Sequence, residues 1–247
     1  MSYADKAVDL GAMFTLDGVD GSTWLDAAGA RDATIVGAAT VAGPGDGLTT
    51  ALDLDGVDDF AYIDHEAAFD RGGLTTSFAV WLNLVSNPEN HYFSVVWSKG
   101  AGNATYRLNG SSSNWNSGQN WWGSSADGWS ALTTDKWMML VAVYDDVAAT
   151  WSMWRRAEDE SSWTVVFDEP WTSQPSANTD PLRAGARGNA VGTEERFAEG
   201  LFAGFTMFDA ALTEQQRDEL FDATFEEDGL ALTVTDVTSD SVTLSWS

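Results

Sequence analysis

Cysteine is absent from the 247-residue chain, and histidine occurs only twice, as His65 and His91. Without cysteine the protein can form no disulfide framework, thiolate nucleophile or cysteine-ligated metal site. The two histidines do not stand in the H-x-x-H or H-E-x-x-H spacing of metal sites, and no G-x-S-x-G motif is present. No run approaches the ~18 apolar residues that span a bilayer, so membrane insertion is not expected.

Basic residues are scarce: 12 Lys+Arg stand against 38 Asp+Glu, a formal net charge of −26. Such a field repels phosphate, so nucleic acid is not expected as a partner, whereas neutral glycans, cations and other proteins remain. Asp outnumbers Glu 26 to 12 and is spread along the whole chain. This surface is typical of proteins from extreme halophiles, where molar salt screens charges within ~3 Å. An ordinary acidic extracellular protein is the alternative.

Short alternating segments dominate the pattern of hydrophobic residues, which make up 44% of the chain. Ser77–Leu84 alternates with the period of two that is typical of a strand with one buried face, whereas Met139–Val143 suits a strand buried on both faces. Many such segments separated by Gly, Asn and Asp predict an all-β sandwich or barrel. A single helix is predicted from Leu212 to Phe225, because Thr213 and Gln216 form a capping box.

The composition changes after residue 226. Residues 230–246 read as two alternating strands around a Thr-Ser-Asp-Ser turn. Two strands do not make a stable domain by themselves, so they are expected to pair with the main domain, to pair with another copy or to begin a further domain. The sequence therefore predicts a main domain over residues 1–226 and a linker with two further strands over 227–247.

Several segments carry a family resemblance in the expected order. They are Ala51–Ile63 (ALDLDGVDDFAYI), Phe78–Leu82, Trp97–Gly100, Lys136–Asp145 and Gly200–Thr213. Together they resemble laminin-G-like domains of the concanavalin A-like lectin/glucanase superfamily, from about residue 9 to 225. The resemblance implies a two-sheet antiparallel jelly roll. Residues 230–246 resemble the first strands of a fibronectin type III domain. One departure is Ala203, which stands where the family's closing motif has an Asp.

Asp55, Asp58 and Asp59 surround a glycine turn and form the first candidate site. Calcium takes 6–8 oxygen ligands from carboxylates and loop carbonyls. Several laminin-G-like and lectin domains, which the chain resembles, hold calcium at the rim of a sheet. The EF-hand spacing is absent, and a tight turn with Asp side chains on backbone amides is the alternative interpretation. Asp17, Asp20 and Asp26 form the next acidic cluster.

The second candidate site is the uncommon segment Asn109–Leu132, rich in Trp, Ser, Asn and Gly. Trp rings stack on sugars and amides bond hydroxyl groups, and aromatic residues in Ser/Gly/Asn loops also build protein-binding surfaces. Packing of these Trp into the sandwich is the alternative. The candidate glycan or receptor ligands are Trp115, Asn116, Trp121, Trp122 and Trp129.

No catalytic function is predicted. Glycoside hydrolysis needs two carboxylates ~5–9.5 Å apart, and glucanases of this superfamily carry them along one strand. The nearest candidate, Glu158–Glu160, is expected in a hairpin loop, where the carboxylates face solvent.

These observations predict a non-catalytic virion-surface protein of a halophilic host, such as a tail fibre, turret or capsid decoration. Its expected partners are a host surface glycan or glycoprotein, other virion proteins and further copies of itself. Residues 1–6 show no secretory signal pattern, which favours this hypothesis. The alternative is an extracellular carbohydrate-binding module or adhesin fragment of a secreted halophilic protein.

Overall fold

The computed structural model describes most of the sandwich and both strands of the tail. The described residues are 1–29, 31–71, 73–84, 95–99, 107–111, 114–115, 135–170, 178–188, 191–194, 197–226, 232–237 and 242–246.

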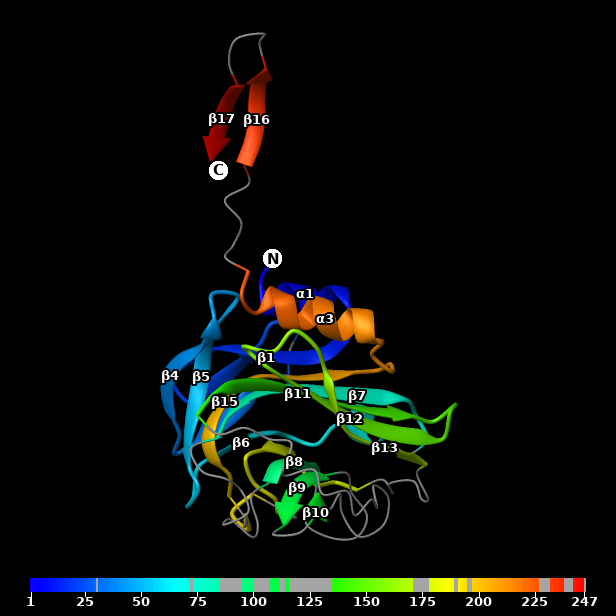
Figure 1. The fold of residues 1–247 in the computed structure, drawn as a ribbon. Coiled ribbons are helices and arrows are strands. Elements are labelled where there is room, and N and C mark those ends of the chain that lie inside the picture. Colours follow the sequence, from blue (N-terminus) through cyan, green and yellow to red (C-terminus); the bar gives the residue numbers. More distant parts are fainter. Residues whose placement is uncertain are drawn as a thin grey trace.

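Two antiparallel sheets form the main body (Figure 1). The back sheet runs in the order β4 (Ala39–Gly45), β5 (Leu48–Asp55), β15 (Glu199–Phe208), β7 (Thr76–Asn83), β11 (Trp137–Asp145), β12 (Thr150–Ala157) and β13 (Thr164–Pro170). The front sheet runs in the order β2 (Thr23–Asp26), β3 (Ala33–Val36), β6 (Phe60–Ile63), β14 (Leu182–Ala184), β8 (Val95–Lys99), β9 (Arg107–Ser111) and β10 (Asn114–Trp115). Strand β1 (Ala12–Asp20) pairs with both β15 and β2 and so joins the two sheets.

The main hydrophobic core lies between the two sheets. Phe78 from the back sheet stacks on Trp97 from the front sheet, with ring centroids 5.3 Å apart. Successive residues of β7 point alternately to this core and to the opposite face, and all but the last are buried. The back sheet is therefore covered on both faces, as the apolar run Met139–Val143 predicts. The expectation of a single buried face for Ser77–Leu84 is wrong, because a second core covers the other face of β7.

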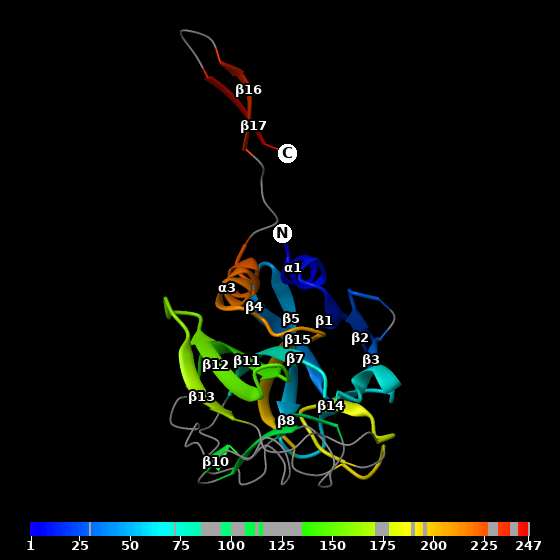
Figure 2. The same ribbon diagram turned by 90° about the vertical axis from the view of Figure 1, so that its right-hand side faces the viewer.

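Two helices cover the outer face of the back sheet, α1 (Tyr3–Asp9) and α3 (Glu214–Ala223), and Figure 2 shows them side by side. Between helices and sheet lies a second core that includes Trp81 and Phe221, whose rings are 5.0 Å apart. Arg217 of α3 lies 4.1 Å from the ring of Trp154 in a cation–π contact. Neither described helix has the length and apolar character needed to cross a bilayer.

The sequence analysis did not predict helix α1. Its signal is a short capping box, in which Ser2 accepts from the Asp5 amide and Asp5 accepts from the Ser2 amide. Tertiary contacts hold this short helix: the buried Tyr3 hydroxyl donates to the Gly204 carbonyl at 2.8 Å and lies 3.0 Å from the Thr206 hydroxyl. Helix α3 and its Thr213–Gln216 capping box confirm the other helix prediction.

The all-β two-sheet prediction is confirmed.

A 3₁₀ turn, η1 (Ala67–Phe69), follows β6. The tail forms an antiparallel hairpin of β16 (Leu232–Val237) and β17 (Val242–Trp246), which pairs with no other described strand.

Candidate functional site

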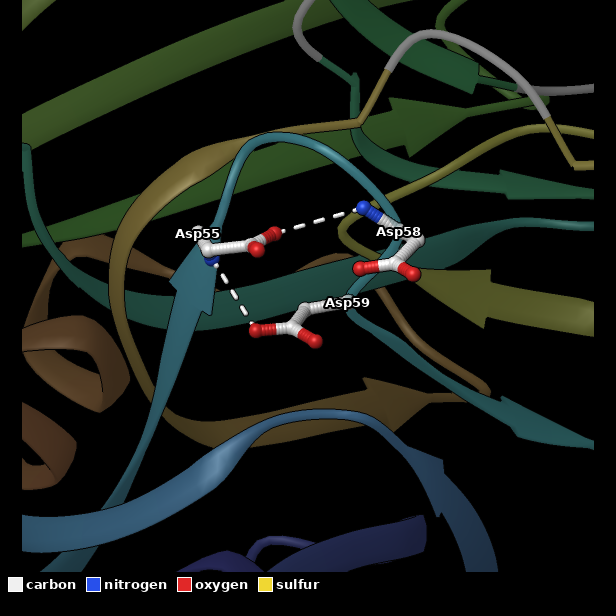
Figure 3. A group of neighbouring side chains, drawn as sticks. All are labelled: Asp55, Asp58 and Asp59. Carbon is white, nitrogen blue, oxygen red and sulfur yellow. Dashed lines mark hydrogen bonds between the residues drawn. The ribbon is translucent and has the colours of Figure 1, made fainter.

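The acidic turn Asp55–Asp59 connects β5 of the back sheet to β6 of the front sheet. Gly56 has a φ of +76°, and a side chain there would come within 2.9 Å of Glu199. Asp55 Oδ1 accepts hydrogen bonds from the amides of Val57 at 2.8 Å and Asp58 at 3.2 Å. Figure 3 shows how Asp59 closes the turn from the other side, where its Oδ2 accepts from the Asp55 amide at 3.1 Å.

The carboxylates of this turn have opposite electrostatic environments. The hydrogen bond from the Val57 amide stabilises the charged form of Asp55 and lowers its pKa. Asp59 is only 8% exposed, and this burial, with the charges of neighbouring aspartates, raises its pKa. Gly37 makes room for the buried carboxylate, because a Cβ at Gly37 would lie 1.9 Å from Asp59 Oδ1.

The three aspartates are close enough to share a cation. Asp55, Asp58 and Asp59 each offer a ligand oxygen, and these atoms all lie within 4.8 Å of one another. Calcium uses 6–8 oxygens, so carbonyl groups or water would have to complete the shell. Two of these carboxylates already accept backbone hydrogen bonds, as the turn interpretation expects. The same three carboxylates thus stabilise the turn and are spaced closely enough to act as metal ligands.

The other acidic clusters have local partners. Asp26 is buried and accepts from the amides of Thr15, Ala28 and Arg31. In the part of the chain that the structure describes, Asp55, Asp58 and Asp59 form the only group of three potential metal ligands at this spacing, so Asp17 and Asp20 do not join Asp26 in a second site.

Glu158–Glu160 lies in the turn between β12 and β13, as the sequence predicts. Asp159 pairs with Lys136, and Glu160 pairs with Arg155. Ala203 is fully buried in the core beneath the helices.

The described backbone places the start of the Trp-rich segment at the edge of the front sheet. Trp115 belongs to β10, which pairs with β9, and β9 in turn pairs with β8. Asn116, Trp121, Trp122 and Trp129 lie outside the described residues.

The sequence analysis missed a covered area on the outer face of the front sheet. Arg183 of β14 is fully buried, and its guanidinium donates to the Gly188 carbonyl at 2.7 Å and to Glu194 Oε1 at 3.1 Å. Ser98 of β8 donates to the Ala186 carbonyl at 2.8 Å. Residues 185–188 and 191–194, hereafter the strap, therefore cover β14 and β8. The sequence signal for this area is Arg183, a charged residue at the centre of a three-residue strand. The residues that bury it are brought there by the fold, so the sequence does not predict them.

No family model and no curated protein matches the chain. Solved structures do match. The binding domain of botulinum neurotoxin serotype D aligns with a TM-score of 0.57 and 13% identity over 90% of this chain and 52% of that one. The chain has a concanavalin A-like fold. That toxin domain has also been solved in complex with N-acetylneuraminic acid.

Two further matches extend the likeness. The binding domain of Paraclostridial Mosquitocidal Protein 1 has a TM-score of 0.60 and 12% identity over 88% of this chain and 53% of that one. Trypanosoma rangeli sialidase in complex with sialic acid has a TM-score of 0.55 and 12% identity over 89% and 36%. The chain thus spans about half of each toxin binding domain and about a third of the sialidase. At 12–13% identity these matches show a shared fold and not a shared function.

Proposed function

We propose that this chain is a non-catalytic, lectin-like module that binds a glycan. The observation that carries the proposal is the concanavalin A-like sandwich, which matches the binding domain of a toxin solved with N-acetylneuraminic acid. A fold hosts many functions, so the proposal needs a binding measurement. Glu158 and Glu160 do not resemble a hydrolytic pair, because they lie in a turn and Glu160 is held by Arg155.

The module belongs, in this proposal, to the virion surface of a virus with a halophilic host. The net charge of −26 and the absence of cysteine support a halophilic setting. In this proposal residues 1–226 are a laminin-G-like domain, and the hairpin β16–β17 resembles the first strands of a fibronectin type III domain. Its partners are host glycans or glycoproteins, other virion proteins and further copies of the chain. An extracellular carbohydrate-binding module of a secreted protein is the alternative setting.

Calcium is part of the proposal, with Asp55, Asp58 and Asp59 as ligands. Their oxygens are closely spaced at the point where the chain crosses from one sheet to the other. A bound cation would offset the mutual repulsion of these carboxylates and fix the turn. It would not need to contact the glycan.

A glycan array probed with the purified protein in ~3 M KCl tests the binding function. Saturable binding to one glycan class supports it, and no binding to any glycan contradicts it. Light scattering of the purified protein and negative-stain imaging of virions distinguish a virion-surface protein from a secreted module. An oligomer attached to virions supports the viral setting, and a monomer favours the secreted module.

A further inference from the structure

A row of side chains crosses the outer face of the front sheet, away from the main core. The strand register places Thr23 beside Thr34, Thr34 beside Tyr62, and Tyr62 beside Arg183. In the sequence their neighbours Trp24, Ala33, Ala61 and Leu182 all belong to the core between the sheets. Because side chains alternate along a strand, the row faces outward on β2, β3, β6 and β14.

One end of this row is covered and the other is open. The strap buries Arg183 completely and holds it through Glu194. Thr34 is exposed, and Thr23 and Tyr62 are partly exposed. Among the described residues none forms a hydrogen bond with the hydroxyl groups of these three residues, so their hydrogen-bonding capacity is open to a ligand.

The partly exposed rings of Tyr62 and Phe197 both pack against the buried Phe60, which lies on the same face of β6 as Tyr62. The buried Phe60 contacts Tyr62 with ring centroids 6.0 Å apart and Phe197 with centroids 6.1 Å apart. Phe197 follows the strap and is itself partly exposed. Rings fixed by packing lose little conformational entropy when they bind a ligand.

We propose that Thr23, Thr34, Tyr62 and Phe197, the outer-face patch, bind a neutral saccharide. The proposal deepens the glycan-binding function and rests on it. Partly exposed rings provide an apolar surface for the C–H groups of a sugar, and three hydroxyls can bond its hydroxyl groups. None of the four described residues that define the patch is charged, although the chain carries a net charge of −26. A carboxylated sugar therefore gains no ion pair from the patch and is repelled by the overall field.

The test compares lactose with 3′-sialyllactose, which differ by one carboxylated sugar, together with a panel of neutral oligosaccharides. Binding is measured by calorimetry at ~0.5 M and ~3 M KCl. Thr34→Glu places a carboxylate in the patch, and Tyr62→Ala removes one ring. Thr40→Glu is the matched control, because Thr40 is also an exposed threonine in a strand, on β4 of the other sheet. Thermal melts confirm that each variant is folded.

We expect a neutral sugar to bind more tightly than its sialylated form, with a larger difference at the lower salt concentration. Thr34→Glu and Tyr62→Ala should each weaken binding about tenfold or more, the equivalent of about 1.4 kcal/mol, and Thr40→Glu should not. Glycan binding that survives both patch variants overturns the patch and leaves the glycan-binding function standing. A preference for 3′-sialyllactose overturns the choice of a neutral ligand. No glycan binding at all overturns both proposals.

Discussion

The buried ion pair between Arg183 and Glu194 gives the sharpest test of the packing described above. The side chains of these residues are 0% and 5% exposed, and Nε and Nη2 of Arg183 each donate to Glu194 Oε1 at 3.1 Å. Glu194 Oε2 accepts from the Gly192 amide at 2.7 Å. Glu194→Ala removes these partners and leaves the guanidinium charge buried; among the described residues, the carbonyls of Gly188 and Pro181 remain as its hydrogen-bond acceptors.

Breaking such a pair from one side costs about 3–5 kcal/mol of unfolding free energy. For a chain of this length, about 2–4 °C of melting temperature is lost per kcal/mol. We therefore expect Glu194→Ala to lower Tm by about 6–20 °C, measured by circular dichroism in ~3 M KCl. High salt should not remove the effect, because buried charges are poorly screened.

Two controls separate this explanation from a general effect of removing charge. Lys136→Ala breaks an ion pair whose side chains are 46% and 55% exposed, and it should change Tm little. The double variant Arg183→Met/Glu194→Met removes both charges from the interior, so it should melt above Glu194→Ala. Equal melting temperatures for Glu194→Ala and Lys136→Ala would show that the strap does not depend on this pair.

Three further predictions concern calcium, the first helix and a buried acid. At a hundredfold excess over Kd, calcium should stabilise the fold by about 2.7 kcal/mol. Thermal melts with calcium and with EDTA measure this gain, and Asp58→Asn should reduce it. A wild-type Tm that is the same with calcium and with EDTA refutes the calcium site. Tyr3→Phe removes two buried hydrogen bonds and should cost about 1–3 kcal/mol in urea unfolding; a loss near zero would show that α1 docks without them. Burial raises the pKa of Asp17 above 3.8, so its charge costs stability at pH 7. Asp17→Asn should therefore raise Tm at pH 7, and the gain should vanish as the pH falls through the raised pKa. Asp20→Asn, an exposed position on the same strand, is the control, and an equal effect there contradicts the argument.

Local patterns were sufficient for much of the fold. The alternation of Ser77–Leu84 and the apolar run Met139–Val143 predicted two central strands, because the period of side-chain direction is written into consecutive residues. The capping box at Thr213 predicted the start of α3 for the same reason. Helix α1 was not predicted, because its seven residues have a weak apolar pattern and its anchor, the Tyr3 hydroxyl bonded to Gly204, joins residues 201 positions apart.

The candidate sites divide along the same line. Asp55, Asp58 and Asp59 are neighbours in the chain, so the sequence alone brought them together, although the burial of Asp59 against Gly37 was not visible there. The Trp-rich segment stays a prediction, because Trp121, Trp122 and Trp129 lie outside the described residues.

By itself, the sequence determined most of the sheet-forming segments, although not β2 or β4. It also determined the acidic surface and the aspartate turn, since each depends on composition or on residues within a few positions. Only the tertiary structure decided what lies on the outer face of the front sheet. Thr23, Thr34, Tyr62 and Arg183 are up to 160 positions apart along the chain, and strand register places them in one row. The burial of Arg183 beneath the strap likewise arises from non-local packing, which no local pattern encodes.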